Sequence, residues 1–193
     1  MSESLWARPA SDLLRSTASA DPTPGGGSIA AITGAFGVGL VQMAVAVTGD
    51  PALEAPAARL AALRAEIEPA ADGDVQDFGA LMAAYRLPRT TDDERAARSR
   101  EVERASIAAT ERPLALVESF VAVLALSHEL EPVVKPGVAS DVLAGRDIVV
   151  GAARAAVRTA DINIDQLDRL GSAAAAGLRA RRDAASAAVE EQL

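Results

Sequence analysis

A glycine-rich segment flanked by prolines stands directly before a long apolar run. It is Pro22-Thr23-Pro24-Gly25-Gly26-Gly27-Ser28, and the run extends from Ile29 to Val47. Prolines and consecutive glycines are costly inside a helix, whereas the apolar run predicts a helix with Ser28 as its N-cap. Backbone N–H groups are unpaired at a helix N-terminus, where the helix dipole is positive. The segment therefore predicts a loop whose bare amides could bind an anionic or carbonyl-bearing ligand.

The three glycines have a second interpretation. They could simply let the chain turn and allow another backbone to approach closely. That explains one or two glycines more readily than three. We therefore favour a ligand-contacting loop, formed by Pro24, Gly25, Gly26, Gly27 and Ser28.

Two aspartates are the candidates for acid–base chemistry. Asp141 follows Ser140, which we expect to cap a helix, and Asp74 lies one turn before Phe78 on a predicted helical face. A carboxylate in such a place can take or give a proton at a reacting carbon. The structural alternatives are that Asp141 compensates a helix dipole and that Asp74 caps a helix after Gly73.

Few basic residues could attract an anionic ligand, and the chain carries a formal net charge of −8. An anion that approaches such a protein needs local positive groups. The candidates are Arg86, Arg89, Lys135 and Arg146. For Arg86 and Arg89 the alternative is a solvated loop, and Asp77 is also expected to be solvated.

Composition excludes several other kinds of site. The chain has no cysteine, so disulfides, thiolate metal sites and cysteine nucleophiles are excluded. The single histidine, His128, follows Phe120 and Leu124 at helical spacing, which predicts the wet end of a packed stripe. A catalytic triad or a zinc site is not expected. The negative charge argues against broad nucleic-acid binding.

Helices must position these residues. Half of the chain is apolar but only 3% is aromatic, which suits closely packed helices, and no clear alternating strand pattern is present. We expect an all-α, single-domain bundle of roughly six to eight helices over residues 1–193. The expected helices are Leu5–Thr17 with Leu13 and Leu14 inward, Ile29–Val47, about Leu53–Ile67, one through Phe78 and Tyr85 after interruptions at Pro69 and Gly73, one from Thr91 to Leu130 that Pro113 could kink, one capped by Ser140, and about Ser172–Gln192.

The run Ile29–Val47 has no charged residue and is long enough to span a bilayer. Glycines and polar residues dilute it, and Asp21 and Asp50 flank it in place of basic and aromatic residues. We therefore expect a central helix of a bundle rather than a membrane contact. The N-terminus lacks a basic region followed by an apolar segment, so no signal peptide is predicted and a cytoplasmic location is expected.

A stripe of residues at helical spacing connects two candidate site residues. It consists of Asp141, Gly145, Ile148, Ala152, Ala156, Thr159 and Asn163. If the helix is continuous, about 33 Å separates Asp141 from Asn163, so both cannot touch one reacting carbon within a single chain. Asn163 then has a structural role or serves a site that another chain completes; we favour the structural role.

The glycine-rich motif resembles the signature of a known enzyme family, and further matches follow in the expected order. Asp74-Val75-Gln76-Asp77-Phe78 with Ala84-Tyr85-Arg86-Leu87-Pro88-Arg89 resembles the family's D-x-x-x-F…A-[FY]-x-L-P-[KR] segment. Ser140-Asp141 resembles its S-D, and Asp161-Ile162-Asn163-Ile164 resembles the second asparagine of its N-V-x-I-N-L element. This is the cyclodeaminase/cyclohydrolase family, which includes the C-terminal domain of formiminotransferase-cyclodeaminase and stand-alone methenyltetrahydrofolate cyclohydrolases.

The resemblance covers most of the chain and implies an all-α homodimer that acts on a one-carbon tetrahydrofolate, with no permanently bound cofactor and no metal. It implies that Asp141 handles protons, that Asp74 supports it and that the glycine loop positions the folate. Arg86, Arg89, Lys135 and Ser140 are further candidates for contact with the substrate. The chain departs from the family pattern at Gly49-Asp50-Pro51, Val134-Lys135 and Thr159.

Two reactions of this family pass through a tetrahedral carbon between two nitrogens. A cyclohydrolase adds water to the methenyl carbon and opens the ring to the 10-formyl form, whereas a cyclodeaminase closes the ring on a formimino group and releases ammonia. We favour the cyclohydrolase because no formiminotransferase domain is attached. The departures favour a third alternative, a non-catalytic folate-binding or structural helical dimer.

Overall fold

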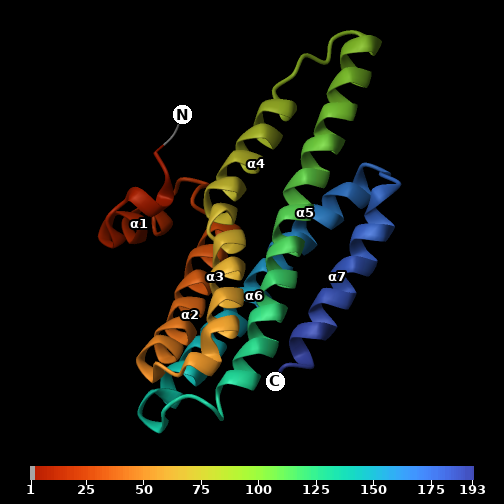
Figure 1. Ribbon diagram of the computed structural model, residues 1–193. Coiled ribbons are helices and arrows are strands. Elements are labelled where there is room, and N and C mark those ends of the chain that lie inside the picture. The colour runs from red at the N-terminus through yellow and green to blue at the C-terminus, as the bar shows by residue number, and fades with distance from the viewer. Residues whose placement is uncertain (1–2) are drawn as a thin grey trace.

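Two antiparallel helices, α2 (Gly26–Thr48) and α6 (Ala139–Arg169), form the centre of the fold in a computed structural model that describes residues 3–193 (Figure 1). Their backbones meet where both helices carry glycine. A Cβ atom on Gly37 would lie 2.7 Å from the carbonyl oxygen of Gly145, and one on Gly145 would lie 2.6 Å from that of Gly37. The two glycines therefore allow α2 and α6 to pack closely at this contact.

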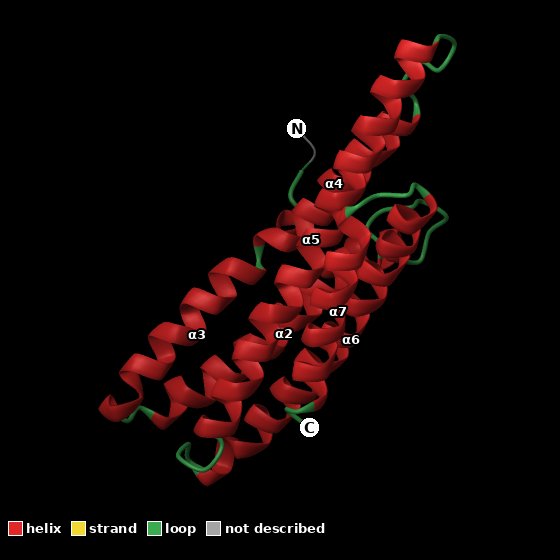
Figure 2. Cartoon of the chain, turned by 90° about the vertical axis from the view of Figure 1, so that its right-hand side faces the viewer, coloured by secondary structure: helices red, strands yellow, loops and turns green. Residues whose placement is uncertain are grey.

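Besides α2 and α6, residues 3–193 form α1 (Ala10–Thr17), α3 (Glu54–Ile67), α4 (Pro69–Tyr85), α5 (Asp92–Leu130) and α7 (Ala174–Glu190), with short 3-10 turns at Leu5–Ala7, Pro51–Leu53 and Pro136–Val138. The helices α3, α4, α5 and α7 pack around the central pair, whereas α1 lies to one side of the bundle (Figure 1). Figure 2 shows only helices and loops in the described part of the chain. The all-α prediction is confirmed for residues 3–193, and α1 to α7 fall within the expected six to eight helices.

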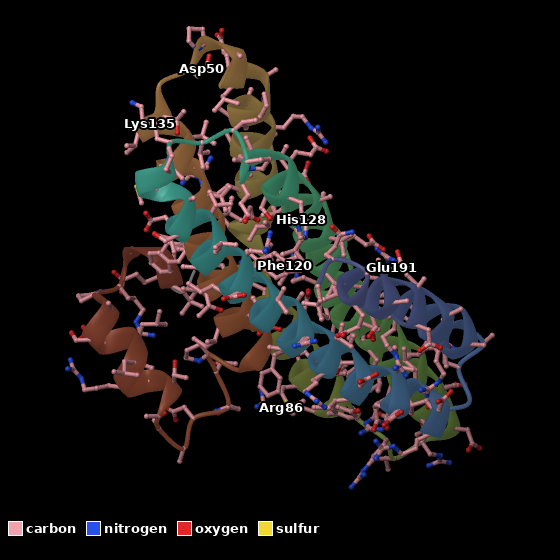
Figure 3. The ribbon with its side chains drawn as sticks, turned by 90° about the horizontal axis from the view of Figure 1, so that it is seen from below. Asp50, Arg86, Phe120, His128, Lys135 and Glu191 are labelled. Atoms are coloured by element: carbon pink, nitrogen blue, oxygen red, sulfur yellow. The ribbon has the colours of Figure 1, made fainter. Side chains whose placement is uncertain are left out.

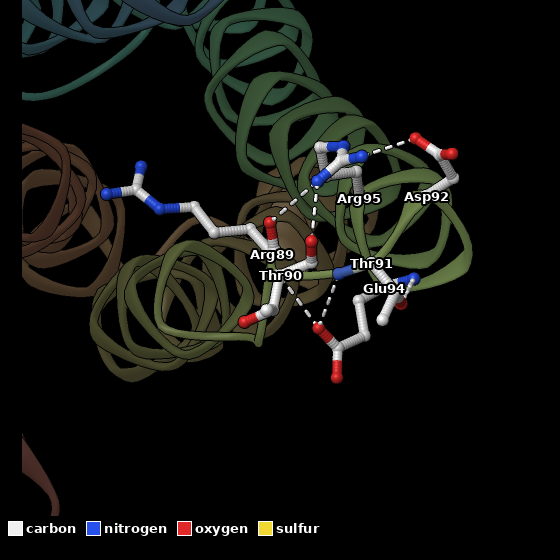
Figure 4. Close-up of polar contacts among 6 residues, drawn as sticks. All are labelled: Arg89, Thr90, Thr91, Asp92, Glu94 and Arg95. Carbon is white, nitrogen blue, oxygen red and sulfur yellow. Dashed lines mark hydrogen bonds and ion pairs between the residues drawn. The ribbon is translucent and has the colours of Figure 1, made fainter.

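The 39-residue helix α5 begins at a capping box, shown in Figure 4. The Thr91 hydroxyl accepts a hydrogen bond from the Glu94 N–H at 3.2 Å, and Glu94 Oε2 accepts from the N–H groups of Thr90 and Thr91 at 2.7 and 3.1 Å. The N–H groups of Thr91 and Glu94, which have no partner within the helix, are satisfied in this way. The cap fixes the start of α5 at the tip of the long α4–α5 hairpin (Figure 1).

A buried proline, Pro113, lies inside α5 and the helix continues past it. Proline has no N–H, so the carbonyl four residues earlier, on Ala109, loses its helical partner. The side chain of Asn163 on α6 replaces it, because Asn163 Nδ2 donates to the Ala109 oxygen at 2.7 Å. A proline in one helix thereby fixes an asparagine on its neighbour.

The structure corrects several predicted helix boundaries. The predicted helix Leu5–Thr17 is a 3-10 turn at Leu5–Ala7 and the separate α1, because proline at position 9 starts a new helix. Leu14 is 70% exposed rather than inward, whereas Leu13 packs against the core. The predicted break at Pro69 is confirmed, because α3 ends at Ile67 and Pro69 begins α4, where a proline costs no hydrogen bond. The predicted break at Gly73 is wrong, because Gly73 lies inside α4.

Two helices, α2 and α5, are long and apolar enough to cross a membrane by length and composition. In each of them 56% of the most apolar window is buried inside the bundle. Val38 and Val41 on α2 and Phe120 and Leu124 on α5 belong to the same buried core. The expected role of Ile29–Val47 as a central helix agrees with this packing.

Candidate functional site

A cavity of about 150 Å³ lies where α2 begins, between α2, α4, α5 and α6. Its floor is the glycine segment, and the other helices provide polar and apolar side chains. The lining residues are Pro22, Thr23, Gly25, Gly26, Gly27, Asp74, Asp77, Phe78, Leu81, Ala109, Thr159 and Asn163. The cavity therefore joins the glycine motif to the first predicted carboxylate.

The carboxylate of Asp74 is anchored to the start of α2. Its Oδ2 accepts hydrogen bonds from the Ser28 N–H at 2.9 Å and from the Ser28 hydroxyl at 2.6 Å. A Cβ atom on Gly27 would lie 2.2 Å from Asp74 Oδ1, so only glycine at position 27 admits the carboxylate. Within residues 3–193 no side chain or backbone group donates to Oδ1, which leaves this oxygen available at the cavity.

Gly25, rather than Ser28, is the N-cap of α2. The predicted cap was wrong because Ser28 lies in the first turn, where its hydroxyl bonds Asp74 instead of the helix end. The structural alternative for Asp74, an N-cap after Gly73, is also wrong, since Asp74 lies inside α4. The two assignments fail together because Asp74, from another helix, satisfies the α2 N-terminus.

Gly25 and Gly26 differ from Gly27 in what surrounds them. A Cβ atom on Gly25 would lie 3.5 Å from the nearest atom, and one on Gly26 would lie 3.6 Å from Thr159 Oγ1. These are ordinary van der Waals distances, so packing alone does not require glycine at positions 25 and 26. Side chains there would instead occupy the cavity.

Asp77 is not solvated as expected, because its side chain is only 17% exposed and forms an ion pair with Arg112 of α5. Asp77 lies three residues after Asp74 and therefore on the same face of α4. The α6 side chains of Thr159 and Asn163 complete the polar lining. Spacing from Asp74 could have identified Asp77, whereas Arg112 gave no sequence signal that links it to this cavity.

Asn163 has the structural role that the sequence favoured, and it also lines the cavity within its own chain. Its Nδ2 satisfies the carbonyl freed by Pro113, which is a structural role. It also lines the cavity beside Asp74. The two are compatible because the amide nitrogen points to α5 and leaves the amide oxygen as an acceptor.

The second predicted carboxylate lies elsewhere. Asp141 is in the first turn of α6, 18 residues before Thr159, so about 27 Å separates it from the cavity. Ser140 is exposed and lies inside α6, so the predicted Ser140 cap is wrong: the cap position is Val138. Within one chain, Asp141 and Asp74 do not meet.

Lys135 also lies at that far end, well apart from Arg86 in Figure 3. Its Nζ donates to the Val47 carbonyl at 3.0 Å and its N–H donates to the Thr48 hydroxyl at 3.0 Å. Both partners are in the last turn of α2. A positive charge there satisfies carbonyls at the negative end of the helix dipole.

Arg86 and Arg89 are exposed at the α4–α5 hairpin tip, where the Arg89 carbonyl accepts from Arg95 at 3.2 Å (Figure 4). Arg86 follows Asp74 by 12 residues, or about 18 Å of helix. Pro24 is buried and lines a neighbouring cavity of about 420 Å³ that shares Thr23 with the first. The structure thus groups the glycines, Ser28 and Asp74, with Pro24 adjoining them.

The clearest pKa shifts lie on the surface. Hydrogen bonds from Arg181 lower the pKa of Glu118, and burial opposes this effect.

His128, the only histidine, is exposed as predicted and contacts the Gln192 carbonyl at 2.9 Å and Arg146 at 3.0 Å.

Comparison with known proteins identifies relatives of this chain. The family model described as formiminotransferase-cyclodeaminase matches residues 9–182. The chain is 35% identical over 159 residues to the methenyltetrahydrofolate cyclohydrolase of Methylorubrum extorquens, covering 78% of this chain and 74% of that protein. It is 29% identical to the formimidoyltransferase-cyclodeaminase of Sus scrofa over 66% of this chain, but spans only 25% of that protein.

Among solved structures, a formiminotetrahydrofolate cyclodeaminase from Thermotoga maritima superimposes with a TM-score of 0.72. The superposition covers 98% of this chain and 97% of that one, at 18% sequence identity, and shows that the fold is shared. With the family model matched over most of its length, the chain belongs to the formiminotransferase-cyclodeaminase family.

Proposed function

We propose that this protein is a methenyltetrahydrofolate cyclohydrolase, converting methenyltetrahydrofolate and water to 10-formyltetrahydrofolate. The observation that carries the proposal is Asp74, which is anchored through one oxygen and has the other free at a cavity floored by glycine. The similarity to the Methylorubrum extorquens enzyme supports the choice of reaction.

Asp74 can act as the general base. The methenyl substrate is cationic at the carbon between two nitrogens, so a nearby carboxylate stabilises its binding. Oδ1 removes a proton from water as the water oxygen attacks that carbon. As the carbonyl then forms, the hydroxyl proton is lost, one carbon–nitrogen bond breaks and the released nitrogen takes up a proton.

The remaining residues bind and orient the substrate. The cavity of about 150 Å³ has room for the reacting centre but not for a whole folate, and the 420 Å³ cavity beyond Thr23 and Pro24 extends it. The Gly25–Gly27 backbone lies against the substrate, and Asn163 offers its amide oxygen. Arg86 and Arg89 remain proposed contacts for the anionic tail.

We also propose that the chain forms a homodimer through the outer face of α2. Phe36 is 65% exposed, Met43 38% and Val47 49%, and no charged residue lies between Ile29 and Val47. A Cβ atom on Gly39 would meet nothing within 4 Å, so apolar side chains of a second copy have room to pack against the helix at this position. In a dimer, the folate site of one chain can be reached by three residues of the other copy that lie far from the cavity of their own chain: Lys135, Ser140 and Asp141. Light scattering should give a dimer, and Phe36→Asp should give a monomer.

The activity is tested with purified protein and methenyltetrahydrofolate, whose near-ultraviolet absorbance decays on hydrolysis. The native chain should accelerate the decay over buffer, and Asp74→Asn should lower kcat/KM by about 10²–10⁴-fold. Asp141→Asn tests the second predicted carboxylate: an unchanged rate removes Asp141 from the reaction, and an equal loss places it in a shared site.

Other outcomes separate the alternatives. Ammonia release from formiminotetrahydrofolate without hydrolysis of the methenyl substrate would make the protein a cyclodeaminase. Folate binding with neither reaction would identify a binding protein. A cytoplasmic location remains a prediction, which fractionation of cells producing the protein would test.

A further inference from the structure

The cavity contains two carboxylates, and Arg112 pairs with one of them. Asp74 and Asp77 lie three residues apart on α4, which places their Cβ atoms about 5–6 Å apart. Two negative charges at such a distance repel each other strongly where little water separates them. Asp77 is ion-paired with Arg112, whereas the partners of Asp74 are the uncharged groups of Ser28.

Arg112 is also packed against the backbone next to Asp74. A Cβ atom on Gly73 would lie 2.3 Å from Arg112 Nη1 and 2.4 Å from its Cζ. The guanidinium therefore occupies the space that a side chain at position 73 would need. Because arginine keeps its proton at all working pH values, this contact carries a permanent positive charge.

Few charged groups other than Arg112 face the two carboxylates. The cavity lining from α2 is glycine, from α6 it is Thr159 and Asn163, and from α5 it is Ala109. On its other side Arg112 borders a separate cavity of about 240 Å³ that Glu66 of α3 also lines. Arg112 is the cation that the structure records in contact with Asp77.

We propose that Arg112 is a positioning residue that makes Asp74 an effective base. It neutralises Asp77, so Asp74 does not face an uncompensated negative charge beside the reacting carbon, and it holds the first turns of α4 against α5. This inference rests on the proposed role of Asp74. It assigns a function to an α5 side chain that does not itself line the cavity.

The charge effect is tested by the pH dependence of kcat/KM. In Arg112→Met the unpaired Asp77 opposes ionisation of Asp74, so the acid limb should move to higher pH by about one unit. The double variant Arg112→Met with Asp77→Asn should return the limb to its native position. Arg112→Lys keeps the charge without the planar contact, so its limb should stay in place.

A matched control is Arg181→Met. It breaks the ion pair between Arg181 of α7 and Glu118 of α5, which lies away from the cavity. Its acid limb should be native. A native limb in a folded Arg112→Met protein, or no return in the double variant, overturns the proposal and leaves Arg112 a purely structural residue.

A readout independent of turnover separates this proposal from the proposed reaction. The side-chain carboxyl carbon of Asp74, followed by ¹³C NMR through a pH titration, should show the same displacement in Arg112→Met and the same return in the double variant. If the native protein hydrolyses no folate but these midpoints move as expected, the reaction is wrong and the pairing is right. Midpoints that do not move overturn the pairing whatever the activity.

Discussion

The two ends of α2 are both rich in polar groups, but they differ in what those groups contact. At the C-terminal end Lys135 donates to Val47 and Thr48, so these polar groups are satisfied by another part of the chain. At the N-terminal end Asp74 uses one oxygen to hold Ser28 and leaves the other at a cavity. Satisfied polar groups stabilise a fold, whereas unsatisfied ones beside a cavity can act on a ligand.

The largest expected effect is from Gly27→Ala at the N-terminal end. The new methyl group would lie 2.2 Å from Asp74 Oδ1, so the carboxylate must move. We expect kcat/KM to fall by about 10²-fold or more, as for other displaced general bases, and the free energy of unfolding to fall by about 1–3 kcal/mol. Folate turnover and urea denaturation measure the two quantities.

Gly79→Ala is the control for this substitution. Gly79 lies in the same helix as Asp74 and a Cβ atom there meets nothing within 4 Å. Alanine should raise the free energy of unfolding by about 0.5–1 kcal/mol and leave turnover unchanged. Equal turnover in the Gly27 and Gly79 variants would contradict the role given to the Asp74 contact.

The next effect concerns the link between Pro113 and Asn163. Asn163→Leu leaves the Ala109 carbonyl without a partner, which should cost about 1–3 kcal/mol of unfolding free energy. In a Pro113→Ala background the restored N–H can bond that carbonyl, so the same Asn163→Leu change should cost clearly less. A double-mutant cycle by urea denaturation measures the difference, and two equal costs would show that Asn163 does not compensate for the proline.

These contacts explain how far the sequence could lead. Composition, helical spacing and the absence of an alternating strand pattern are signals that need no tertiary contact, and they predicted the all-α fold. Glycines before an apolar run predicted the loop that lines the cavity. The contacts of Asn163 with Ala109 and of Arg112 with Asp77 join residues 54 and 35 positions apart. They depend on how α4, α5 and α6 pack, so no local pattern could reveal them.

The same reason accounts for the misplaced caps. Ser28 and Ser140 have the residue type that favours an N-cap. In the structure the first bonds Asp74 from α4 and the second lies inside α6, whose start is preceded by the turn Pro136–Val138. Local preference was overruled by tertiary contacts at the first site and by the preceding turn at the second.

A smaller effect is expected at the C-terminal end of α2. Lys135→Met removes the Nζ bond to Val47, which is exposed to solvent, so the free energy of unfolding should fall by about 1 kcal/mol or less. Turnover should stay within about twofold of native, because this end lies remote from Asp74 in the same chain. A strong loss of turnover without a loss of stability would instead mean that Lys135 acts in the site of a partner copy.

The smallest effect lies outside both ends, at the ion pair between Glu118 of α5 and Arg181 of α7. Hydrogen bonding to Arg181 lowers the pKa of Glu118 in the folded chain. Its stabilisation is therefore complete above the unfolded pKa of about 4.3 and is lost as pH falls through the lower folded value. Both side chains are more than a third exposed, so Glu118→Gln should cost only about 0.5 kcal/mol at pH 7.

Urea denaturation of native protein and Glu118→Gln at pH 7 and pH 3 measures this difference. The cost should be seen at pH 7 and should shrink at pH 3, because pH 3 lies below the unfolded pKa of Glu118 and the unfolded chain then binds the proton. Glu129→Gln, an exposed position on the same helix, should change neither value. Because the ion pair is distant from the cavity, turnover by Glu118→Gln should stay native. A fall in turnover here would mean that satisfied surface pairs also govern the site, and the contrast between the two ends of α2 would lose its meaning.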